Sequence, residues 1–154
     1  MGNVLITGAS SGLGAAIAKQ FASRGDSLYL VARRKALLED LKAELLATGA
    51  PSVDYRVVDL EDETQVQQLA DDPPKIGVDV LINNAAFGQW DYSWDTTPAK
   101  MRAMIAVNVS AVAVLSVAFS QIKHEQPARL MNVASGAGYA LFESSIPYSA
   151  SKFF

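Results

Sequence analysis

The chain alternates short apolar runs with longer segments in which apolar residues recur every three or four positions. The apolar runs predict buried strands over residues 4–6, 27–32, 53–58, 78–82 and 128–134. The periodic segments predict helices over residues 12–24, 37–45, 64–70 and 103–122. Strands that alternate with helices indicate a doubly wound parallel sheet, which is an α/β fold with right-handed crossovers.

Turn-forming residues separate these elements. Gly25, the segment 48–51 and the Asp-Asp-Pro-Pro segment 71–74 are expected to end the first three helices. Residues 87–98 follow no period and include Trp90, and we expect a loop there. No repeat or linker interrupts the pattern, so residues 1–154 are expected to form a single domain.

Residues 103–122 include no charged side chain, and on length alone they could span a bilayer. Asn108, Ser116 and Gln121 lie within this stretch, which also follows several strand–helix units of a sheet. We therefore interpret it as a long helix packed on the sheet and expect no membrane association.

Composition excludes several classes of function. The net charge is −3 with no run of like charges, so a nucleic-acid partner is not expected. The absence of cysteine excludes disulfides and thiolate metal sites, and with a single histidine we expect no metal. The lack of cysteine and of a signal-peptide pattern fits a cytoplasmic protein.

The first predicted strand runs into a glycine-rich turn with the spacing G-x-x-x-G-x-G. Gly8 would let the chain leave the strand, Gly12 would let backbone N–H groups approach a phosphate, and Gly14 would let the next helix pack closely. The N-terminus of that helix would face the anion. A lone glycine-rich turn is weak evidence, because glycines also mark ordinary loops.

Polar residues follow the other predicted strands, at the edge of the sheet where such folds bind ligands. They are Arg33, Asp59, the segment 83–86 and Ser135. Tyr148 and Lys152 come next, spaced i and i+4, so a helix would place them on one face. A nearby cation favours a phenolate, and such a pair suits acid–base chemistry on a hydroxyl or carbonyl. Taken alone, this spacing also arises by chance.

Together these motifs resemble the short-chain dehydrogenase/reductase family over the whole chain. Residues 7–14 resemble its cofactor loop, Asp59-Leu60 its adenine-contacting pair and Asn83-Asn84-Ala85 its fourth-strand motif. The resemblance implies a Rossmann-like fold and a catalytic set of Asn108, Ser135, Tyr148 and Lys152. It also implies the following cofactor-binding set: Thr7, Gly8, Ser10, Ser11, Gly12, Leu13, Gly14, Arg33, Arg34, Asp59, Leu60, Asn84, Ala85, Tyr148 and Lys152.

The mechanism implied by this resemblance is hydride transfer between a nicotinamide cofactor and a carbonyl or secondary alcohol. Ser135 would hydrogen-bond the substrate oxygen, and Tyr148 would give or take its proton. Lys152 would favour the phenolate and hold the nicotinamide ribose, while Asn108 would seat a water that links Lys152 to solvent. As structural alternatives, Ser135 caps a turn and Asn108 kinks its helix.

The end of the second strand predicts the cofactor NADP(H). NAD enzymes place an acidic residue there, whereas this chain has Ala32 followed by Arg33 and Arg34. A guanidinium would bind a 2′-phosphate with charge-assisted hydrogen bonds. Arg33 is the better candidate because it lies nearer the strand end, and the alternative for Arg34 is that its side chain is only solvated.

The chain departs from the family pattern in two ways. Ala86 stands where the fourth-strand motif usually ends in glycine, and 154 residues compare with about 250 in family members by resemblance. We therefore expect a fragment of a longer reductase, with a naturally short chain as the alternative. An open fifth strand would favour association, and so we expect a homo-oligomer. The alternative function is a non-catalytic nucleotide-binding remnant that works through association.

Aromatic and aliphatic residues near the expected site predict an apolar substrate. They are Trp90, Trp94, Tyr139, Leu141, Phe142 and Ile146. Such residues more often simply pack in the fold.

Overall fold

The computed structural model describes residues 2–88, 93–124, 127–140, 144 and 146–153. Five parallel strands form one sheet with the order β3-β2-β1-β4-β5. They are β1 (Asn3–Thr7), β2 (Ser27–Ala32), β3 (Val53–Val57), β4 (Val80–Asn83) and β5 (Arg129–Asn132). Leu5 of β1 lies between Tyr29 of β2 and Leu81 of β4, which fixes the register at the centre of the sheet. The predicted doubly wound parallel sheet is confirmed.

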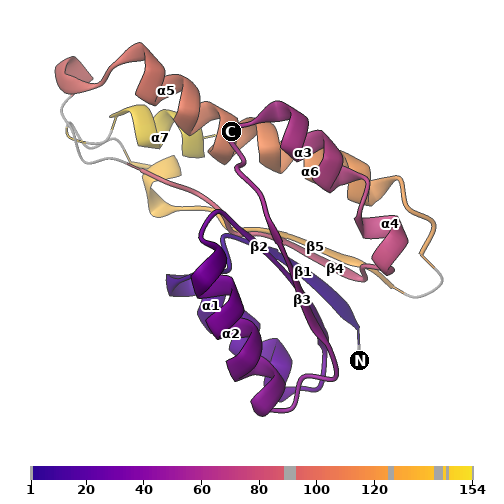
Figure 1. Cartoon of the computed structure of the whole chain (residues 1–154). Helices are drawn as coiled ribbons and strands as arrows, with labels where there is room; N and C mark the ends of the chain where they lie inside the picture. Colours follow the sequence, from indigo (N-terminus) through magenta and orange to yellow (C-terminus); the bar gives the residue numbers. More distant parts are fainter. Residues whose placement is uncertain (1, 89–92, 125–126, 141–143, 145, 154) are drawn as a thin grey trace.

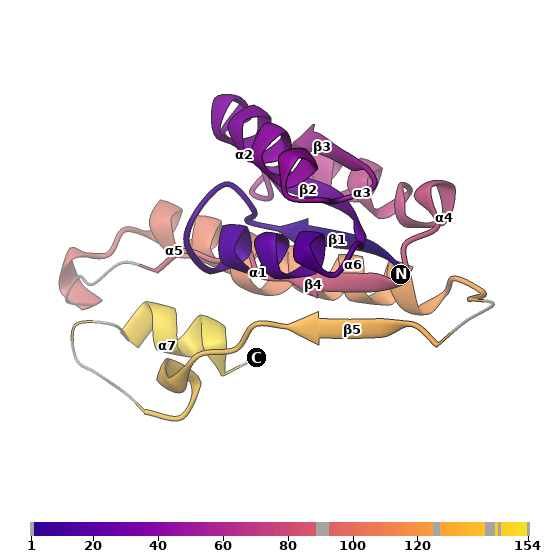
Figure 2. The same cartoon turned by 90° about the horizontal axis from the view of Figure 1, so that it is seen from below.

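Helices cover both faces of this sheet (Figure 1). One face carries α1 (Gly12–Ser23) and α2 (Lys35–Ala47). The other face carries α3 (Glu63–Ala70), α4 (Pro73–Ile76), α5 (Pro98–Ile105) and α6 (Ala111–Ser120). A π-helical turn, Ala106–Ser110, joins α5 to α6. The short helix α7 (Ile146–Lys152) lies beyond the carboxyl end of β5 (Figure 2).

Two cores follow from the alternation of side chains along the strands. Val4 and Ile6 face α1 and α2, and pack with Leu30 and Leu38. Leu5 faces the other side and belongs to a second cluster with residues of α3 and α6. Both faces of β1 are therefore buried, which explains why its residues are apolar without interruption.

The boundaries of several elements differ from the predictions. The Asp-Asp-Pro-Pro segment ends α3 at Ala70 as predicted, but its prolines also begin α4, because proline is tolerated at the first helical positions. The predicted loop 87–98 includes a 3-10 turn, Ser93–Asp95, while residues 89–92 lie outside the described residues. The helix predicted from residue 103 begins at Pro98, where the Thr97 hydroxyl accepts a hydrogen bond from the Lys100 N–H.

The continuous helix from Pro98 to Ser120 is long and apolar enough to cross a membrane by length and composition. In this fold its inner face packs on the sheet and on α3. Met104, Ala111, Leu115 and Phe119 are buried along that face. The prediction that this helix packs on the sheet is confirmed.

Candidate functional site

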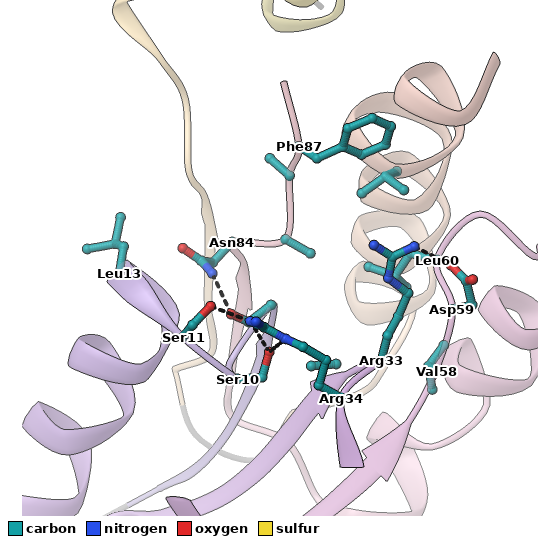
Figure 3. A pocket seen from close by; sticks show the side chains of 15 residues that line it. Ser10, Ser11, Leu13, Arg33, Arg34, Val58, Asp59, Leu60, Asn84 and Phe87 are labelled. Atoms are coloured by element: carbon teal, nitrogen blue, oxygen red, sulfur yellow. Dashed lines mark hydrogen bonds and ion pairs between the residues drawn. The ribbon is translucent and has the colours of Figure 1, made fainter. Parts of the chain in front are cut away.

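A cavity of about 470 Å³ opens at the carboxyl ends of the strands. Most of the predicted cofactor-binding residues line it, together with Val58, Phe87 and Val107 (Figure 3). These are Gly8, Ser10, Ser11, Leu13, Arg33, Arg34, Asp59, Leu60, Asn84 and Ala85. The sheet thus brings together residues that lie up to about 80 positions apart in the sequence, as expected for a ligand site at the carboxyl edge of parallel strands.

The glycines of the first loop have distinct structural roles. Gly8 and Gly12 have φ values of 67° and 56°, which residues with a side chain rarely adopt. A Cβ atom on Gly14 would lie 2.4 Å from the carbonyl oxygen of Gly8, so only glycine lets α1 approach β1 this closely. No side chain caps the first turn of α1 at Ser11, and its N–H groups are available to an anion.

Thr7 and Asn84 fasten this loop to the end of β4. The Thr7 hydroxyl accepts hydrogen bonds from the backbone N–H groups of Asn84 and Ala85, at 3.1 and 3.0 Å. The Asn84 amide donates to the carbonyl oxygens of Thr7 and Gly8. Thr7 itself is buried, so in this structure its side chain supports the conformation of the loop and does not line the cavity.

The two arginines after β2 point in different directions across the cavity (Figure 3). Arg34 donates through Nε and Nη2 to the Ser10 hydroxyl, at 3.2 and 2.9 Å, and through Nη2 to the Ser11 hydroxyl. Arg33 forms ion pairs with Glu61 at 3.2 Å and Asp59 at 3.8 Å. Arg34 is exposed, but it is not only solvated, because the serines of the loop hold its guanidinium beside the glycine-rich turn.

Ser135 and Lys152 lie close to the end of β5. The Ser135 hydroxyl accepts a hydrogen bond from the Ala137 N–H and begins a 3-10 turn, Gly136–Gly138. The Lys152 ammonium donates to the carbonyl oxygen of Val133 at 3.2 Å. Half-burial lowers the pKa of Lys152 by desolvation. Ser135 caps a turn, as its structural alternative predicted, and its oxygen retains acceptor capacity for a ligand.

Several contacts hold α7, which carries Tyr148, against the rest of the fold. Ser149 donates to the carbonyl oxygen of Ala140, and both Ser149 and Ser151 are buried. A Cβ on Gly138 would lie 2.4 Å from the carbonyl oxygen of Lys152. Sequence reasoning missed these residues, since neither a buried serine nor a closely packed glycine leaves a periodic signal.

Asn108 occupies the π-helical turn and is 5% exposed. Its Oδ1 accepts from the Phe87 N–H at 3.0 Å, and its Nδ2 donates to the Phe87 carbonyl oxygen at 2.8 Å and to the Ser151 hydroxyl at 2.9 Å. The amide thus joins the segment after β4 to α7. The π-helical turn at Asn108 agrees with the structural alternative, in which Asn108 interrupts its helix. These contacts do not test the water link from Asn108 to Lys152, which stays a prediction.

The predicted apolar pocket finds limited support in the described part of the chain. Tyr139 and Trp94 are 90% and 68% exposed and lie at the surface. Trp90, Leu141 and Phe142 lie outside the described residues.

The doubly wound sheet and its strand-end cavity define a Rossmann-like nucleotide-binding protein, and the residues present fit a dinucleotide. The glycine loop, the uncapped helix N-terminus and Arg34 all converge on the cavity that anionic groups would enter. A family profile described as short chain dehydrogenase matches residues 2–154. The chain belongs to the short-chain dehydrogenase/reductase family of oxidoreductases.

The proteins similar to this chain include a reductase and complexes with either NADPH or NAD. Sulfoacetaldehyde reductase 2 of Chromohalobacter salexigens is 35% identical over 98% of this chain and 61% of its own length. A short-chain dehydrogenase from Sphingobium yanoikuyae in complex with NADPH is 31% identical, with a TM-score of 0.94 over 100% of this chain and 61% of that one. A Burkholderia phymatum family member in complex with NAD is 34% identical, with a TM-score of 0.90 over 99% and 55%. The chain thus spans less than two thirds of the length of these relatives.

Proposed function

We propose that this protein is an NADP(H)-dependent oxidoreductase that acts on a carbonyl or secondary alcohol. The observation that carries the proposal is the guanidinium of Arg34, which Ser10 and Ser11 hold at the rim of the cavity. A 2′-phosphate would replace the serine hydroxyls as acceptor and form charge-assisted hydrogen bonds with Arg34. The sequence places no acidic residue directly after β2 that would repel it.

Arg33 is the second candidate for the 2′-phosphate. Its ion pairs with Glu61 and Asp59 are solvent-exposed, and exposed pairs contribute little stability, so a phosphate could compete for the guanidinium. The structure favours Arg34 over Arg33 because the guanidinium of Arg34 already lies against the phosphate loop. This reverses the order that proximity to the strand predicts.

The chain's own residues supply binding and proton transfer. Gly8 and the first turn of α1 would hold the pyrophosphate, while Asp59 and Leu60 would border the adenine. Tyr148 would protonate the substrate oxygen during reduction, with Ser135 as a second hydrogen-bonding group. When bound, the nicotinamide supplies the hydride. Lys152 would stay within reach of the site through its contact with Val133.

Initial rates with NADPH and NADH, measured against a panel of aldehydes and ketones, test the proposal. NADPH should be preferred, and Arg34→Ala should reduce its affinity by roughly ten- to a hundredfold, which corresponds to about 1.5–3 kcal/mol. The affinity for NADH should change little. Arg33→Ala serves as the matched comparison and should have a smaller effect. Equal affinities for the two cofactors in the unmodified protein would contradict the NADP(H) assignment.

Measuring NADPH binding together with turnover distinguishes an enzyme from the alternative function, a non-catalytic nucleotide-binding remnant. Tight NADPH binding without turnover of any substrate would favour a non-catalytic nucleotide-binding protein.

A further inference from the structure

Gly88 lies directly against the aromatic ring of Tyr148. A Cβ atom built on Gly88 would be 2.5 Å from Cδ2, 2.8 Å from Cγ and 2.9 Å from Cε2 of that ring. Such distances are shorter than carbon atoms tolerate without movement. The backbone of Gly88 is not in the left-handed region that favours glycine. The tyrosine ring therefore accounts for glycine at this position, and the backbone conformation does not.

The segment before Gly88 is fixed, so it cannot easily retreat from a side chain. Both backbone polar groups of Phe87 are hydrogen-bonded to the amide of Asn108, at 3.0 and 2.8 Å. Asn108 is buried in the π-helical turn, where an amide without these partners would be costly to desolvate. A side chain at position 88 would consequently push the ring rather than the backbone.

The same amide also fixes the helix that carries the ring. Asn108 Nδ2 donates to the Ser151 hydroxyl at 2.9 Å, and Ser151 in turn donates to the carbonyl oxygen of Tyr148 at 2.8 Å. Asn108 thus connects to Tyr148 along two routes, through Phe87 and Gly88 on one side and through Ser151 on the other. The two routes set where the ring lies relative to the end of β4.

We propose that Gly88 is a positioning residue for Tyr148, and that the Asn108–Ser151 hydrogen bond holds α7 in the place where the ring fills the space beside Gly88. The proposal rests on the proposed function, in which Tyr148 is the proton donor. Gly88 itself touches the ring and need not touch substrate or cofactor.

Gly88→Ala is the first test. A displacement of about 1 Å at a reacting group can reduce the rate on the order of a hundredfold, and we expect a fall of that size in kcat. The dissociation constant for NADPH should stay within about twofold, because Arg34 and the glycine loop are unaffected. Gly136→Ala is the matched control, since a Cβ on Gly136 meets no atom within 4 Å and its backbone is not left-handed.

A spectroscopic readout follows the ring independently of activity. In protein labelled with ¹³C at the tyrosine ring, the Tyr148 signal is assigned by its absence in Tyr148→Phe. Gly88→Ala should shift that signal and Gly136→Ala should leave it in place. A protein without turnover would contradict the proposed function, while the shift would still test the position of the ring. An unchanged Tyr148 signal in a folded Gly88→Ala variant would overturn the proposal.

Ser151→Ala tests the second route and does not introduce a clash. We expect kcat to fall about tenfold with a shift of the Tyr148 signal. Ser120→Ala is its matched control, because Ser120 also donates to the carbonyl three residues earlier, at 2.7 Å, but lies exposed on α6. If Ser151→Ala behaved like Ser120→Ala in both measurements, the link through Asn108 would not position Tyr148, and the proposal would be wrong.

Discussion

At the scale of single residues, the proposed chemistry depends most on the phenol of Tyr148. Tyr148→Phe removes only the proton donor, so we expect turnover to fall by roughly 10²- to 10⁴-fold while NADPH still binds. Lys152→Ala should lower turnover and also weaken NADPH binding, since the Lys152 ammonium would also hold the cofactor ribose. Steady-state kinetics together with fluorescence titration of NADPH measure the two effects.

Tyr55→Phe provides the control for loss of a phenol. Tyr55 lies partly buried on β3 and its phenol donates to Glu39 at 2.8 Å, and removal of that hydroxyl should change neither quantity. Near-normal turnover in Tyr148→Phe would mean that the proton comes from another group.

A second tyrosine has a role in stability that depends on pH. Burial, together with the neighbouring carboxylate of Asp72 to which the phenol donates at 3.2 Å, raises the pKa of Tyr29 to about 12. The unfolded chain would titrate near pH 10. The protonated phenol therefore stabilises the fold fully below pH 10, and this contribution is lost as the pH rises toward 12.

Urea unfolding of the unmodified protein and of Tyr29→Phe between pH 8 and 11 measures this linkage. The difference in unfolding free energy between the two should be constant up to about pH 10 and then shift against the unmodified protein. A difference that does not change with pH over this range would show that Tyr29 titrates alike in both states.

At the scale of secondary-structure elements, α1 packs against the loop before it without room for a side chain at position 14. Gly14→Ala would place Cβ 2.4 Å from a backbone oxygen, and backbone cannot rotate away as a side chain can. We expect a loss of about 1–3 kcal/mol in unfolding free energy, with weaker NADPH binding. Urea unfolding measures the change, with Gly136→Ala as the control. Equal stability of the two variants would show that α1 shifts freely on the sheet.

The elements that the sequence predicts well are those buried on both sides or on one clear face. β2 and α1 were located to within a residue, because an unbroken apolar run and a spacing of four residues each have one interpretation. α4 and the π-helical turn were missed for physical reasons. A proline at the start of a helix resembles one that breaks it, and a π turn retains the apolar character of the helix around it.

For the candidate site, the sequence predicts which residues lie near the cavity but not how their side chains are directed. The rule that ligands bind at strand ends placed Arg33 and Arg34 there correctly. Which serine or carboxylate each guanidinium contacts depends on side-chain rotamers that neither spacing nor composition encodes. The contact of Gly88 with Tyr148 joins positions 60 residues apart, and no local pattern could reveal it.

At the scale of the whole molecule, the two edges of the sheet differ in character. β3 carries Asp54 and Arg56, whose charges are paired with Lys42 and Asp72. β5 has every residue exposed, and its centre consists of Leu130 and Met131 at 44% and 43% exposure. Charged edge strands resist pairing with other chains, whereas apolar ones invite it. Among the described residues, β4 is the one strand paired with β5.

We therefore expect the polypeptide of residues 1–154 to associate through β5. Its weight-average mass in sedimentation experiments should increase with concentration over the micromolar range. Leu130→Lys should shift the equilibrium toward monomer, because an association through this edge would have to desolvate the added ammonium. Val57→Lys is the matched control, since Val57 is also 44% exposed but lies on β3. A monomer at all concentrations, or equal effects of the two lysines, would show that the apolar edge of β5 does not drive association.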